Sequence, residues 1–116
     1  MLSDWDKQEF TLRLTRVAQE IHETALAKGW WDAPRNDGEV IALCHSELSE
    51  ALEAIRHGNP LDQHCPEFTS VEIELADVII RILDYAYQRG HALAPAILAK
   101  MEFNETRPHK HGGKAF

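Results

Sequence analysis

The segment Val71-Glu-Ile-Glu-Leu-Ala-Asp-Val-Ile-Ile-Arg-Ile-Leu-Asp-Tyr-Ala-Tyr87 is unusually apolar for its length in this 116-residue chain. Its apolar side chains at helical spacing are Val71, Leu75, Val78, Ile79, Ile82, Leu83, Ala86 and Tyr87. They cover most of a helical circumference, and a helix of that kind is usually buried centrally. Thr69 or Ser70 can cap such a helix and Gly90 can end it. We therefore predict a central helix from about Thr69 to Arg89.

A narrow polar stripe crosses this predicted helix. At about 100° per residue, its members fall within about 80° of one another. They are Glu74, Asp77, Arg81, Asp84 and Gln88. Glu74 and Asp77 stand at i, i+3 and so face the same way. Acids are rarely buried without a partner, so this pair predicts either a bound cation or a structural ion pair with Arg81, which lies one turn on.

Three further helices are predicted before and after this segment. Their expected ranges are about Asp4–Lys28, Gly38–His57 and Leu93–Asn104. The expected buried stripes of the first two are Phe10, Leu14, Val17 and Ile21, and then Ile41, Cys44, Leu48, Leu52 and Ile55. No segment alternates apolar and polar residues as a strand does. We therefore predict an all-α fold, with a single domain over residues 1–116 that ends in an irregular basic tail at 107–116.

A second acidic pair lies in the predicted helix Gly38–His57. Glu47 and Glu50 stand at i, i+3, and 23 residues separate Glu50 from Glu74. If the two helices pack antiparallel, the four acids can converge, and they then repel one another unless they are protonated or bind a cation. Oxygen ligands favour Mg²⁺ or Mn²⁺ over zinc. The pattern alone leaves a second interpretation open, because such pairs are also common on solvated helix faces.

The charge distribution argues against a general nucleic-acid binder, which needs a basic surface. The net charge is −7, divided into −9 over residues 1–99 and +2 from Lys100 onward. Cys44 and Cys65 are the only cysteines, and both are expected to be free thiols. We expect no signal peptide, because Met1–Asp6 is acidic and no apolar region follows. No apolar run is long enough to span a bilayer. The expected location is the cytoplasm.

Two acidic motifs in order carry a resemblance to a known family. They are Glu47-Leu-Ser-Glu50 and Glu74-Leu-Ala-Asp77, followed by the block Lys100-Met-Glu-Phe-Asn104-Glu-Thr-Arg107-Pro108 and then by Gly112-Gly113-Lys114. From about Lys28 to the C-terminus, the chain resembles the all-α nucleoside triphosphate pyrophosphohydrolases of the MazG type. Either acidic motif alone is weak evidence, whereas both in this order and spacing, with the third block, are specific.

The resemblance implies Mg²⁺-dependent hydrolysis of nucleoside or deoxynucleoside triphosphates to the monophosphate and pyrophosphate, as in nucleotide-pool housecleaning. The implied metal ligands are Glu47, Glu50, Glu74 and Asp77, with Mn²⁺ as a second possible metal. Glu50 is the implied catalytic residue, which helps to activate the attacking water. The expected substrate-binding residues are Lys100, Asn104, Arg107 and Lys114. The resemblance also implies a four-helix bundle. Because so short a chain leaves apolar surface exposed, we expect a homodimer or homotetramer to complete it.

The connector Trp30–Asp37 carries two adjacent tryptophans. One interpretation is that they cover the core. The other is that Trp31, together with Arg35, contacts the nucleotide, since every base has a π-face on which an aromatic ring can stack. Two different functions also stay open at this point. One is a non-catalytic helical interaction or regulatory module, and the other is a transition-metal binder that uses His109 and His111.

Overall fold

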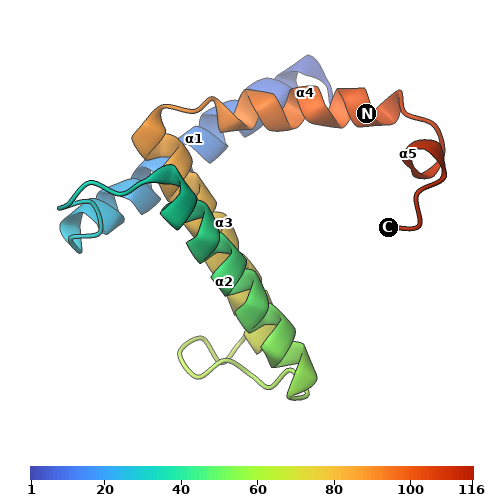
Figure 1. Cartoon of the computed structure of the whole chain (residues 1–116). Coiled ribbons are helices and arrows are strands. Elements are labelled where there is room, and N and C mark those ends of the chain that lie inside the picture. Colours follow the sequence, from blue (N-terminus) through green and yellow to red (C-terminus); the bar gives the residue numbers. More distant parts are fainter.

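The computed structural model describes residues 1–116 and consists of helices joined by loops (Figure 1). The helices are α1 (Asp4–Ala27), α2 (Asp37–Arg56), α3 (Ser70–Arg89), α4 (Leu93–Glu105) and the short α5 (Lys110–Gly113). The only β-type pairing is an isolated bridge between Leu61 and Thr69. The predicted all-α class is therefore confirmed. None of the helices combines the length and apolarity needed to cross a lipid bilayer.

The helix ends follow from local capping chemistry. Ser3 and Asp6 form a reciprocal capping box at the start of α1, and Thr69 and Glu72 do the same for α3. Asn36 caps α2 through its side chain, so this helix begins one residue before the predicted Gly38. Gly90 ends α3 in the left-handed conformation at φ 70°, as the sequence predicts. The predicted irregular tail contains α5, but its interior residues have non-helical backbone angles.

The helices are arranged as two antiparallel pairs that meet at one end of α3 (Figure 1). α2 packs along α3, while α1 packs against both α3 and α4. An ion pair between Lys7 and Glu102 ties the start of α1 to the end of α4. Figure 1 shows that α4, α5 and the C-terminus extend away from the α2–α3 pair. The two arms leave the molecule open, with extents of 40 × 35 × 30 Å.

The buried stripe of α2 differs from the predicted one. Ile41, Leu48, Leu52 and Ile55 are exposed, so their predicted burial is wrong for the single chain, and only Cys44 is buried as expected. The inward stripe is instead Val40, Cys44, Glu47 and Ala51. The physical reason is that α2 contacts one neighbouring helix and presents its small side chains to it, so the large apolar side chains lie on the opposite side.

α3 is likewise only half covered. Val78, Leu83 and Ala86 are buried, whereas Leu75, Ile79, Ile82 and Tyr87 are exposed. The predicted central burial of this helix is therefore wrong for the single chain. Val17 of α1 is exposed too. Because only 10 of the 116 residues are buried, one chain leaves much of the apolar surface of its helices in contact with solvent.

Candidate functional site

The acidic residues of α2 and α3 meet midway along the antiparallel helix pair. Oxygen atoms of Glu47, Glu50 and Glu74 lie within 4.8 Å of one another. Glu47 is buried, Glu74 is half-buried and Glu50 is exposed. The solvent exposure of the three side chains therefore increases across the site, from the buried Glu47 to the exposed Glu50. We call these three residues the acidic cluster.

Glu74 is the carboxylate that the fold satisfies least. Its Oε2 atom is buried and has no hydrogen-bond partner. Burial raises the pKa of Glu74 to about 7, and the carboxylates of Glu50, Asp77 and Glu47 add to the rise. The folded chain alone therefore disfavours the charged form of Glu74. A hard divalent cation among these oxygens would remove the repulsion and give Oε2 a partner.

Asp77 lies beside the acidic cluster, one helical turn from Glu74. Burial raises its pKa and the carboxylate of Glu47 raises it further, while Arg81 opposes the rise. Its oxygens do not belong to the set of mutually close oxygens formed by the acidic cluster. The structure thus brings three of the four predicted metal ligands into one group and leaves the fourth, Asp77, near enough for the charge of Glu47 to raise its pKa.

Arg81 fixes the buried end of the acidic cluster. Its Nε atom donates to Oε1 of Glu47 at 2.7 Å. The side chain of Glu47 is 11% exposed and that of Arg81 is 34% exposed, so the ion pair is shielded only in part. The pair orients the Glu47 carboxylate toward α3. The structural ion pair that the sequence left open is therefore formed, but its acid is Glu47 of α2 and not Asp77.

A cavity of about 260 Å³ lies beside the acidic cluster. It is bounded by the C-terminal half of α1, the connector, α2 and α3. Its charged lining residues are Glu47, Asp77, Asp84, Lys28, Arg35 and Arg81. Ile21, Ala25, Trp30 and Ile80 supply the apolar part. Two members of the acidic motifs thus face a concave space that is lined by both signs of charge. Concavity is a general feature of small-molecule sites.

Trp31 belongs to a polar cluster that ties the connector to α1 and α3. Its Nε1 atom donates to both carboxylate oxygens of Asp84 at 3.0 Å. His22 Nδ1 lies 2.7 Å from Oδ1 of the same carboxylate. The guanidinium groups of Arg35 and Arg89 lie 5.0 and 5.5 Å from the centre of the Trp31 ring. The indole is therefore engaged in the fold, whereas the exposed Trp30 is the tryptophan that lines the cavity.

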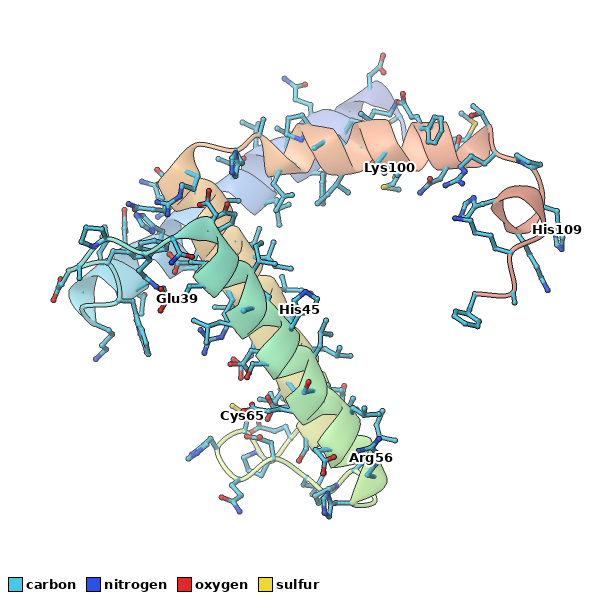
Figure 2. All side chains as sticks on the ribbon, viewed as in Figure 1. Glu39, His45, Arg56, Cys65, Lys100 and His109 are labelled. Atoms are coloured by element: carbon cyan, nitrogen blue, oxygen red, sulfur yellow. The ribbon has the colours of Figure 1, made fainter.

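The predicted substrate-binding residues of the C-terminal region lie apart from the acidic cluster within one chain. Figure 2 shows Lys100 on α4 and His109 beyond it, on the arm that leads away from α2. Lys100 and Arg107 lie over the ring of Phe103, at 4.6 and 5.7 Å from its centre. Asn104 and Lys114 are exposed on the same arm. None of these four residues lines the cavity beside the acids.

Several residues of the site carry no strong signal in the sequence. The sequence stripe contains Asp84 and Arg81, but it does not show that His22 and Trp31 bind the former or that Glu47 binds the latter. Lys28 looks like an ordinary residue at a helix end. The glycine beside it, Gly29, indicates that the helix ends there. A chain that turns at this point can fold the connector back over the helix and bring Lys28 into the site.

No family model, curated protein or solved structure matches this chain.

Proposed function

We propose that this chain is a MazG-type nucleoside triphosphate pyrophosphohydrolase. It would hydrolyse nucleoside or deoxynucleoside triphosphates to the monophosphate and pyrophosphate with Mg²⁺, and its role would be nucleotide-pool housecleaning in the cytoplasm. The observation that carries the proposal is Glu74, whose buried Oε2 has no partner while two further glutamate carboxylates converge on it. A helix pair that keeps such a group in its interior is best explained by a cation that completes it.

The donor set fits a hard divalent ion, because it consists of carboxylate oxygens alone. Glu47, Glu50 and Glu74 would hold the ion, with Asp77 beside them, and Mn²⁺ could replace Mg²⁺. When bound, the ion supplies neutralisation of phosphate charge and an activated water. Arg81 keeps Glu47 oriented through their 2.7 Å contact. Glu50, the solvent-exposed member, would accept a proton from the water that attacks the α-phosphorus.

A second copy of the chain is part of the proposal. The large apolar side chains on the outer side of α2 and α3 are exposed, notably Leu48, Leu52 and Ile79. Two α2–α3 pairs that face each other would bury these side chains and form a four-helix bundle. A homodimer or a homotetramer would satisfy this requirement. In such an assembly, the tail cations Lys100, Arg107 and Lys114 and the amide of Asn104 could reach the site of a neighbouring copy.

The test is a panel of common and damaged nucleoside triphosphates, each assayed for pyrophosphate release with and without magnesium. We expect release from at least one of them, dependent on magnesium. Glu50→Gln and Asp77→Asn should abolish it while the helical circular dichroism stays unchanged. Glu53→Gln, an exposed acid on α2 outside the acidic cluster, is the matched control and should retain activity. The absence of pyrophosphate release from every nucleotide would contradict the proposal.

A further inference from the structure

The cavity beside the acidic cluster is lined by cations that differ in their partners. Arg81 is paired with Glu47. Lys28 and Arg35 line the same cavity but form no salt bridge with any acid of the chain. In a chain whose net charge is −7, two cations that line one cavity without a carboxylate partner are available to an anion that comes from outside.

Arg35 is held in place by the polar cluster beneath it. Its guanidinium lies 5.0 Å from the centre of the Trp31 ring, and Trp31 is itself fixed by two hydrogen bonds to Asp84. The backbone carbonyl of Arg35 accepts a hydrogen bond from Arg89 at 2.6 Å. Both ends of the residue are thus restrained by aromatic and backbone contacts, which leaves the N–H donors of the guanidinium free of carboxylates. A planar guanidinium with free donors suits the oxygens of a phosphate.

Lys28 reaches the same cavity from the end of α1. It is the C-cap of the helix, and the chain then turns at Gly29, whose φ is 85°. A side chain at Gly29 is disfavoured, because residues with a side chain rarely adopt this positive φ. The turn brings Trp30 and Arg35 over the cavity that Lys28 borders. The connector and the end of α1 therefore present one cationic wall.

We infer that Lys28 and Arg35 bind the polyphosphate of the substrate, on the side of the cavity that faces Glu47 and Asp77. The inference rests on the proposed function, which supplies the cation on the acidic side. A polyphosphate between a metal-bearing acidic wall and a cationic wall is neutralised from both sides. The phosphate contacts would then come from the connector of the same chain, in addition to any that the tail residues Arg107 and Lys114 provide.

The test measures binding of inorganic tripolyphosphate by calorimetry, in the presence of magnesium and at pH 8. Lys28→Met and Arg35→Met should each weaken binding about tenfold, as expected for the loss of one charged contact. Arg35→Lys, which keeps the charge, should weaken tripolyphosphate binding less than Arg35→Met does. Arg13→Met on α1 and Arg56→Met on α2 are matched controls, because these residues are salt-bridged and lie outside the cavity. They should bind like the unmodified chain.

Each outcome separates the inference from the proposed function. If tripolyphosphate binding weakens in the cavity variants but no nucleotide releases pyrophosphate, the phosphate site stands and the proposed reaction fails. If pyrophosphate is released and the double variant Lys28→Met/Arg35→Met binds tripolyphosphate with unchanged affinity, the reaction stands and the inference is overturned. Failure of the unmodified chain to bind tripolyphosphate also overturns it. If the cavity variants bind a free nucleoside more weakly but bind tripolyphosphate with unchanged affinity, the two cations belong to a base site and the inference is overturned.

Discussion

Glu74 and Asp84 lie ten residues apart on the same polar stripe of α3, yet their carboxylates have opposite surroundings. Asp84 accepts two hydrogen bonds from Trp31 and contacts His22, so the chain itself satisfies it. Glu74 has a buried oxygen without a partner and faces other acids. One stripe thus combines two kinds of carboxylate. The chain itself satisfies the acid in the C-terminal half, whereas it leaves a buried carboxylate oxygen in the N-terminal half without a partner.

The largest expected effect is a loss of activity when acids of the site at the N-terminal half of the α3 stripe are changed. Asp77→Asn or Glu50→Gln should lower magnesium-dependent pyrophosphate release by about 100-fold or more, since ligand and general-base losses have effects of that size. Neither change should reduce the melting temperature, because each removes a carboxylate from a crowded acidic site. Kinetics and thermal unfolding on the same preparations check both statements. A variant that is inactive because it is unfolded would leave the helical signal reduced and would contradict this assignment.

The next largest effect is a loss of stability when Asp84, in the C-terminal half of the α3 stripe, is changed. Asp84→Ala should lower the free energy of unfolding by about 3 kcal/mol, because it leaves the Trp31 and His22 nitrogens without their acceptor in a largely buried place. Asp84→Asn keeps one acceptor oxygen and should lower the free energy of unfolding by less than Asp84→Ala does. Urea unfolding at fixed protein concentration measures both changes. Equal stability of Asp84→Ala and the unmodified chain would show that the polar cluster does not stabilise the connector.

A smaller effect depends on pH and on Glu74. Its pKa of about 7 in the folded chain lies above the ordinary 4.5, so the folded state binds more protons than the unfolded state between these values. The metal-free chain should therefore lose stability from this group as the pH rises from about 4.5 to 7. Glu74→Gln should remove this loss. At pH 8 without metal, it should melt a few degrees higher than the unmodified chain, and near pH 4 the two should be alike.

Thermal unfolding across this pH range, in buffer treated with a chelator, checks the sign. Glu72→Gln is not a suitable control, because Glu72 takes part in the capping box of α3. Glu67→Gln, an exposed acid in the loop before α3, is the matched control and should keep the pH dependence of the unmodified chain, because it retains Glu74. A Glu74→Gln chain that melts lower than the unmodified chain at pH 8 would contradict the account of Glu74 as a destabilising group.

The fold class and the acidic residues could be predicted because they depend on local patterns. Each of these features depends on a short segment of sequence: the cap at Thr69, the helix end at Gly90 and the acidic pairs at i, i+3. Which side of α2 is buried could not be predicted, because Leu48 and Leu52 have the larger apolar surface, whereas the small residues Cys44 and Ala51 allow close contact with α3. That choice belongs to the packing of two helices and is not visible in either helix alone.

The partners of the polar stripe were beyond prediction for a similar reason. Asp84 and Trp31 are 53 residues apart in the chain, and Glu47 and Arg81 are 34 apart. The first contact requires the connector to fold back from Gly29 onto α3, and the second requires α2 to pack along α3. The resemblance predicted phosphate binding by the tail, whereas the cations that line the cavity within one chain are Lys28, Arg35 and Arg81.

A magnesium titration shows whether the Glu74 half of the stripe binds a divalent cation. Calorimetry at pH 8 would compare the unmodified chain with Glu74→Gln and with Asp84→Asn. We expect saturable binding to the unmodified chain and to Asp84→Asn, and binding at least about tenfold weaker to Glu74→Gln. Equal magnesium affinity in the unmodified chain and in Glu74→Gln, or no binding to the unmodified chain, would contradict this expectation.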